Sequence, residues 1–193
     1  DVEDLRAAGE DKADLDWKAA QDFLAQVQNL SLVNTNTWVS EDEEDRGGFA
    51  YSPGSGASKT NAEGKVTLRS YGSMTYAGLL SLIYAEVDER DVRVQSAKDW
   101  AARHWSLEEN PGMGQEGLYY FFNVLAKSLR ACGEDTLTRP DGSVVTWREE
   151  VVRKLVSLQN PDGFWVNENN RWWEADPNLV TAYTLMALAT ALE

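Results

Sequence analysis

The sequence LRACGED at residues 129–135 repeats LRAAGED at residues 5–11, with one substitution of Cys for Ala. Each copy is followed by a polar stretch, a tryptophan (Trp17 or Trp147) and an amphipathic segment. Such self-similarity is the sequence signature of proteins built from repeated units. The second copy closes a long apolar segment, whereas no apolar segment precedes the first. We therefore expect the chain to begin inside a repeat and to be the C-terminal part of a longer protein.

Two kinds of helix are predicted to alternate along the chain. Apolar residues on one stripe, with polar residues elsewhere, indicate amphipathic outer helices. These outer segments are residues 17–30, 92–105 and 147–158. Apolar residues on nearly every face indicate inner helices that are buried on every face. These inner segments are residues 74–87, 118–131 and 179–192.

The alternation of outer and inner helices predicts an all-α fold. Three outer/inner hairpins, with each inner helix packed on its neighbours and on its own outer helix, form an arc of an α/α toroid or an α-solenoid. Residues 1–193 are assigned to a single domain, in which residues 35–69 form a long loop insertion that is either functional or disordered. The acidic run at residues 41–45 is expected to be solvated. Short hairpin pieces are expected at residues 65–68 and 144–145.

Composition limits the possible partners. The 193 residues are 42% hydrophobic, which is enough to bury a core. The formal net charge is −14 at pH 7. It argues against nucleic acid and an anionic membrane surface as partners, because both are bound through Lys and Arg. No apolar run is long enough to cross a bilayer. The single cysteine, Cys132, excludes an intrachain disulfide.

The sharpest local motif is QNPDGFW at residues 159–165. Gln159, Gly163 and Trp165 fit the pattern Q-x-x-x-G-x-W, which resembles the QW motif of squalene-hopene and oxidosqualene cyclases and the repeats of protein prenyltransferase β-subunits. Weaker copies stand at residues 109–114 and at residues 28–49, where an insertion splits the motif. We expect the Gln to reach unpaired backbone groups at a helix terminus, the Gly to allow a tight reversal, and the Trp to cover the junction.

Three further stretches are similar to bacterial proteins with prenyltransferase/squalene-oxidase repeats. They are residues 71–78 (YGSMTYAG), 114–120 (GQEGLYY) and 171–177 (RWWEADP). The resemblance covers most of the chain, roughly residues 17–192. It implies an α/α toroid of the terpenoid cyclase and protein prenyltransferase type, with the inner helices around a central cavity. It also favours a secreted or periplasmic location.

The resemblance stops at the catalytic motifs. Squalene-hopene cyclases protonate an alkene with a D-x-D-D motif, which this chain lacks. Protein prenyltransferases bind zinc through Asp, Cys and His, but this chain has only His104 and Cys132, on different predicted helices. We expect no metal and no cofactor. Whether the chain is an enzyme stays open; if so, it is a terpene cyclase-like intramolecular transferase or lyase.

Aromatic residues gather near the starts of the inner helices, and aromatic faces can stabilise a cationic intermediate. Ordinary packing in a Trp-rich core is the alternative. Asp176 and Glu116 are the candidate catalytic carboxylates, although capping of the following helix is the alternative for Asp176. The candidate substrate-binding residues are Tyr71, Tyr76, Tyr119, Tyr120, Trp165, Trp172, Trp173 and Tyr183.

Three functions fit these observations. The first is a squalene-cyclase-type enzyme that handles isoprenoids and takes its acid from outside this chain. The second is a non-catalytic toroid that binds a lipid or a protein. The third is a carbohydrate-active α/α barrel, since such barrels also combine aromatic clefts with paired carboxylates. A three-hairpin arc leaves an apolar wall that needs a cover: N-terminal repeats, a second copy, or an isoprenoid or lipid ligand.

Overall fold

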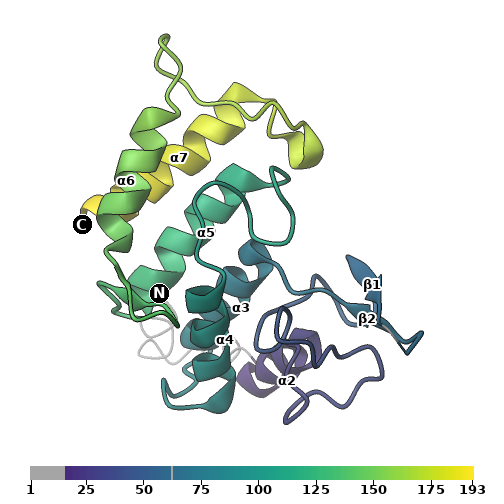
Figure 1. The fold of residues 1–193 in the computed structure, drawn as a ribbon. Coiled ribbons are helices and arrows are strands. Elements are labelled where there is room, and N and C mark those ends of the chain that lie inside the picture. Colours follow the sequence, from purple (N-terminus) through teal and green to yellow (C-terminus); the bar gives the residue numbers. More distant parts are fainter. Residues whose placement is uncertain (1–15, 62) are drawn as a thin grey trace.

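A computed structural model describes residues 16–61 and 63–193, and this part of the chain is mainly helical (Figure 1). The predicted outer and inner helices are confirmed, with ends that differ by no more than a few residues. The first copy of the LRAAGED repeat lies outside the described residues. The six helices are α2 (Trp17–Val27), α3 (Gly72–Tyr84), α4 (Val92–Arg103), α5 (Leu118–Ala131), α6 (Trp147–Ser157) and α7 (Pro177–Leu192).

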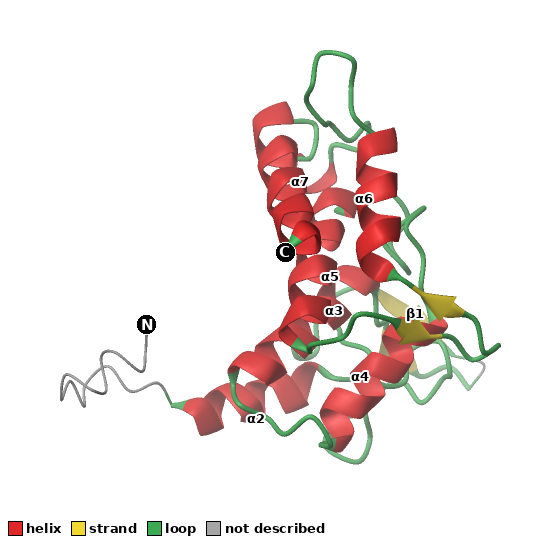
Figure 2. Ribbon diagram, turned by 90° about the vertical axis from the view of Figure 1, so that its left-hand side faces the viewer, coloured by secondary structure: helices red, strands yellow, loops and turns green. Residues whose placement is uncertain are grey.

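The three inner helices stand in a row. Helix α5 packs against α3 on one side and α7 on the other, and the outer helix α6 packs on α7 (Figures 1 and 2). Helix α5 packs on its own outer helix α4 less closely than expected, since α4 reaches the cluster around α5 through Ala101. Helix α4 packs mainly on α3, because Val94 and Ala97 of α4 are buried in one cluster with Leu79 and Leu82 of α3.

Helix α5 is the centre of the larger hydrophobic cluster. Its side chains Phe121, Phe122 and Leu125 are fully buried, and they share the cluster with Trp147 of α6 and Val180 of α7. Removal of apolar surface from water stabilises such a cluster by about 25 cal/mol per Å². The packing of α5 therefore fixes the positions of both neighbouring inner helices.

One face of helix α7 is exposed, which contradicts the expectation that inner helices are buried on every face. Leu185, Met186 and Leu192 are exposed although the helix contains no charged residue. Among the described elements, only α5 and α6 pack closely on α7, and they leave these side chains exposed. An apolar composition therefore predicted the helix but not its complete burial.

The turn at residues 159–165 departs from its expected bonding. Gln159 Nε2 donates to the carbonyl of Gly163 in the same turn (2.9 Å), and does not reach a helix terminus. Gly163 has a φ of +91°, so the reversal uses the left-handed region that glycine tolerates. The indole N–H of Trp165 donates to the carbonyl of Leu155, in the last turn of α6 (2.7 Å). The tryptophan, rather than the glutamine, therefore donates a hydrogen bond to a backbone carbonyl at the end of the helix.

The weaker copy of the motif at residues 28–49 is split by an insertion, but its two halves lie side by side in the structure. Gln28 Nε2 donates to the carbonyl of Gly47 (2.9 Å), and the amide of Asn29 donates to the carbonyl of Gly48 (2.8 Å). The residues between Asn29 and Gly47 therefore loop out from a turn whose two halves still meet.

The insertion at residues 35–69 is attached to two helices: the amide of Phe49 donates to Thr75 Oγ1 of α3 (3.1 Å), and the indole N–H of Trp100 of α4 donates to the carbonyl of Glu44 (2.8 Å). The insertion carries the antiparallel strands β1 (Ser58–Thr60) and β2 (Val66–Leu68), which confirm the hairpin expected there. The expectation of a solvated acidic run is wrong for Asp45, which is buried. Its Oδ1 accepts a hydrogen bond from the amide of Ser70 (3.0 Å), and its Oδ2 lies 2.7 Å from Lys59 Nζ.

The second expected hairpin is also present, as strands β3 (Leu137–Thr138) and β4 (Val144–Val145). It joins α5 to α6. Within the described ranges, no helix combines the length and the apolar character that a membrane span requires.

Gly78 tests the contact between α3 and the insertion. A Cβ at Gly78 would lie 2.4 Å from the Phe49 ring. Ala in a helix interior is normally about 1 kcal/mol more favourable than Gly. We expect the clash to outweigh this gain, so that Gly78→Ala lowers the free energy of unfolding by about 1–3 kcal/mol. Ser81→Ala, on the exposed side of α3, is the control and should change it by less than about 0.5 kcal/mol. A stabilised Gly78→Ala variant in urea denaturation would contradict this packing.

Cys132 provides a test by pH. Burial raises the pKa of its thiol from 9.0 to about 11. The folded chain therefore keeps a proton that the unfolded chain releases, and the resulting stability is complete below pH 9 and is lost as the pH rises toward 11. We expect Cys132→Ala to weaken the fall of stability across this range. The native thiol should also react with iodoacetamide about 100-fold more slowly than the thiol of the urea-unfolded chain. Equal rates would contradict its burial.

Candidate functional site

An aromatic pocket lies at the N-terminal ends of the three inner helices. Its volume is about 410 Å³, within the range of about 300–1,000 Å³ that is usual for small-molecule sites. Helices α3, α5 and α7, the turn after α4, the insertion and the segment before α7 all contribute to its wall. The lining residues are Tyr51, Tyr71, Ser73, Met74, Asn110, Met113, Glu116, Gly117, Tyr120, Trp172, Trp173, Glu174, Leu179 and Tyr183.

Most of the aromatic residues proposed from the sequence meet in this pocket. Tyr71, Tyr120, Trp172, Trp173 and Tyr183 all line it, although they come from distant parts of the chain. The sequence analysis missed Tyr51, which comes from the insertion.

The other three aromatic candidates are core residues. Tyr76 is buried with its ring 5.8 Å from Phe121, and Tyr119 is buried with its ring 5.8 Å from Phe122. Trp165 is buried beside α6, where its indole is already hydrogen-bonded. The packing interpretation therefore holds for these three residues, and the ligand-binding interpretation does not.

Two consecutive tryptophans hold a strained backbone at the rim. Trp172 and Trp173, in the 3₁₀ turn η2 (Arg171–Trp173), have φ angles of +63° and +61°. This left-handed region is rare for residues with a Cβ and costs about 1–2 kcal/mol each. The ring of Trp172 stacks on that of Tyr51 (centroids 6.3 Å apart), whereas Trp173 is 76% exposed. Strain of this kind concentrates at functional sites.

Glu174 connects two of the segments that form the pocket, and the sequence analysis did not select it. It is 0% exposed. Its Oε1 accepts a hydrogen bond from the amide of Tyr120 at the start of α5 (2.8 Å), and its Oε2 accepts one from Asn167 Nδ2 (2.7 Å). Asn167 Nδ2 also donates to the carbonyl of Gln115 (2.7 Å). One buried side chain therefore joins the segment before α5 to the segment before α7.

The two proposed carboxylates have different places. Asp176 is the N-cap of α7, where its Oδ1 accepts a hydrogen bond from the amide of Asn178 (2.9 Å), and it does not line the pocket. The capping interpretation of Asp176 is therefore confirmed. Glu116 lines the pocket, and its Oε2 lies 3.9 Å from the guanidinium of Arg171.

Four tyrosines line the pocket, and their phenol groups lie near one another. They are Tyr51, Tyr71, Tyr120 and Tyr183. Burial, followed by the proximity of Tyr51 and Tyr120, raises the pKa of Tyr71, and burial together with the nearby Tyr183 raises the pKa of Tyr120. These phenols therefore stay neutral at physiological pH. No described residue forms a hydrogen bond with the hydroxyl groups of these four tyrosines, so the hydroxyls remain available to a ligand.

Metal chemistry finds no support in the described part of the chain. It contains no group of three or more His, Cys, Asp or Glu side chains that could hold a metal ion. His104 ends α4 and stacks on Trp100 at 4.2 Å, whereas Cys132 is buried at the end of α5.

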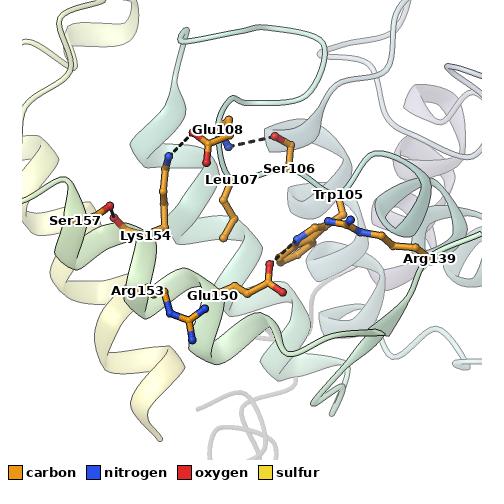
Figure 3. Close-up of a pocket in the computed structure, with 9 residues that line it drawn as sticks. All are labelled: Trp105, Ser106, Leu107, Glu108, Arg139, Glu150, Arg153, Lys154 and Ser157. Carbon is orange, nitrogen blue, oxygen red and sulfur yellow. Dashed lines mark hydrogen bonds and ion pairs between the residues drawn. The ribbon is translucent and has the colours of Figure 1, made fainter. Parts of the chain in front are cut away.

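A second pocket of about 630 Å³ lies between the segment after α4 and helix α6 (Figure 3). One ion pair and one hydrogen bond connect its lining side chains. Lys154 Nζ lies 2.6 Å from Glu108 Oε2, and Trp105 Nε1 donates to Glu150 Oε2 (3.0 Å). Figure 3 also labels Arg139, from the β3–β4 turn, among the residues that line this pocket. None of the residues proposed from the sequence lines this pocket, and the aromatic pocket is the stronger candidate.

Comparison with known proteins adds no assignment, because no family model, curated protein or solved structure matches the chain.

The strain at Trp173 can be measured. Ala is usually more stable than Gly by about 0.5–1 kcal/mol. At a φ of +61° we expect the reverse, with Trp173→Gly more stable than Trp173→Ala by about 1 kcal/mol in urea denaturation. The exposed helical residue Glu149 is the control, and there the Ala variant should be the more stable one. The same order at both positions would mean that Trp173 is not strained.

Proposed function

We propose that this chain is part of a squalene-cyclase-like toroid protein that binds an isoprenoid or similar lipid-like ligand in the aromatic pocket. The observation that carries the proposal is the convergence of six aromatic side chains on one pocket at the ends of the inner helices. Aromatic and apolar walls with a few polar groups are the usual surroundings of an apolar ligand. The role proposed for the pocket is binding rather than cyclisation.

The arrangement of helices supports a toroid as the complete architecture. Helices α3, α5 and α7 form one row, and outer helices pack on that row. The exposed apolar face of α7, with Leu185 and Met186, is the side on which a further helix would continue the row. We propose that additional repeats or a second copy of the chain cover this face.

The pocket carboxylates argue against cyclisation by these residues alone. Protonation of an alkene needs a carboxylic acid whose proton is held in dry surroundings and aimed at the substrate. The Glu116 side chain is 40% exposed and lies beside Arg171, and both oxygens of Glu174 already accept N–H hydrogen bonds. A cyclase reaction in this pocket would therefore take its acid from elsewhere.

A carbohydrate-active function is the second candidate, and one observation favours it. Two carboxylates, Glu116 and Glu174, line the same aromatic pocket, and glycoside hydrolases use such a pair. The engagement of both Glu174 oxygens weighs against this candidate, because neither oxygen is left to a water or a glycosidic bond.

Ligand binding by the pocket can be tested with farnesol, a neutral isoprenoid alcohol. We expect saturable binding, followed by intrinsic tryptophan fluorescence or calorimetry. Trp172→Ala and Tyr120→Ala should each weaken it about tenfold, since an aromatic contact contributes about 0.5–1.5 kcal/mol in addition to buried area.

The matched control is Tyr84→Ala. Tyr84 is 63% exposed at the far end of α3 and does not line the pocket, so its loss should leave farnesol binding unchanged. Equal effects of all three variants, or no binding by the folded wild-type chain, would overturn the proposal. Binding of an oligosaccharide that only the two pocket variants weaken would favour the second candidate instead.

A further inference from the structure

The aromatic pocket has an asymmetric set of charges. Two carboxylates, Glu116 and Glu174, line it, and none of the lining residues is Lys, Arg or His. The charge of Glu116 is offset by Arg171, whose guanidinium lies 3.9 Å away. Glu174 forms no ion pair with any cationic side chain of the described residues, and its hydrogen bonds come from an amide N–H and a side-chain amide. The pocket therefore carries a negative charge that the protein does not neutralise.

An unmatched carboxylate away from water is costly. Buried charges are normally paired, because the protein interior replaces only part of the hydration that a charge loses on burial. Glu174 is fully buried within the wall of the pocket, so its charge acts on the pocket at short range without contact to water. A positively charged ligand would supply the missing partner within the low dielectric of the site, where the attraction is stronger than in water.

The aromatic walls add to this preference. The face of an aromatic ring is electrostatically negative and attracts cations within about 6 Å. The Trp172 ring already attracts one cation of the protein, because Arg171 Cζ lies 4.6 Å from the centre of this ring. Tyr120 and Tyr183 form an edge-to-face pair at 5.8 Å, and their free hydroxyl oxygens add further partial negative charge.

We propose that the ligand carries an organic cation, a quaternary or tertiary ammonium group, and that this group is held against the aromatic walls, with the charge of Glu174 behind them as its counter-charge. This inference rests on the proposed function, since it names the charge of the ligand in the same pocket. The apolar part of such an amphiphile lies on Met74, Met113 and Leu179, which line the pocket as well.

The experiment compares two probes of the same shape. Choline carries a trimethylammonium group, and 3,3-dimethylbutan-1-ol replaces its nitrogen by carbon and has no charge. We expect the wild-type chain to bind choline about three- to thirty-fold more tightly than the neutral probe, in NMR titration or calorimetry. Dodecyltrimethylammonium and dodecanol, used below micelle-forming concentrations, repeat the comparison with an apolar chain attached.

Variants show which residues cause the preference. Glu174→Gln keeps the size of the side chain and removes its charge, so the preference for the charged probes should fall to less than half of its wild-type value. Glu149→Gln removes one exposed carboxylate on α6, far from the lining residues, and should leave the preference unchanged. If Glu174→Gln does not fold, the charged and neutral probes are compared on the wild-type chain and on Glu116→Gln. Equal binding of the two probes by both proteins would then overturn the cation.

The outcomes separate this inference from the proposed function. Equal binding of the charged and neutral probes, together with binding of farnesol, would overturn the cation and leave the apolar ligand. Choline binding without farnesol or dodecanol binding would support the cation and overturn the lipid-like ligand. A preference for choline that Glu149→Gln reduces as much as Glu174→Gln would assign it to the net charge of the protein and overturn the specific site.

Discussion

The burial of helix α5 between α3 and α7 is the constraint on which the rest of the structure depends. Because Phe121, Phe122 and Leu125 have no exposed surface, α5 cannot shift without opening the larger core cluster. The three inner helices are therefore held side by side, and the segments that precede them meet at one end. The aromatic pocket is a consequence of this packing, since it forms where those segments meet.

The segments themselves are held by polar contacts that the core does not supply. Glu174 and Asn167 connect the residues before α5 with the residues before α7. The insertion, pinned in part through Asp45 and Ser70, brings Tyr51 against Trp172. The pocket is thus rigid at its base, where side chains are buried, and open at its rim, where Trp173 is exposed.

The sequence predicts the helices well because each inner segment is a long apolar run and each outer segment has a clear stripe. The same apolar composition makes the residues of the aromatic pocket difficult to identify from the sequence. In an α-helix that is apolar on all sides, composition does not reveal which face points to the core. Tyr119 and Tyr120 are neighbours in the sequence and turn about 100° apart on the helix. Tyr119 enters the core against Phe122, and Tyr120 enters the pocket against Tyr183.

Glu174 escaped prediction for a related reason. It lies in RWWEADP, a stretch selected as part of the family resemblance, and its neighbour Asp176 has the evident local role of a helix cap. Nothing local distinguishes Glu174 from a surface glutamate, because its burial depends on the amide of Tyr120, which lies far away in the sequence. Long-range contacts of this kind are visible only in the folded chain.

The aromatic pocket combines two features that reduce stability. Two tryptophans occupy a backbone region that disfavours them, and a buried glutamate has no cationic partner among the described residues. Glycine in the turn would relieve the first feature, and an uncharged side chain in place of Glu174 would remove the second, although glutamine could accept only one of the two N–H hydrogen bonds that Glu174 accepts. A fold that needed only packing would not require them. A binding site does require them, because the strained turn presents the indoles of Trp172 and Trp173 to the pocket and the carboxylate gives it a charge. The physical cost and the chemistry of the site therefore both support the proposal that the pocket recognises a ligand with an apolar body and a positive charge.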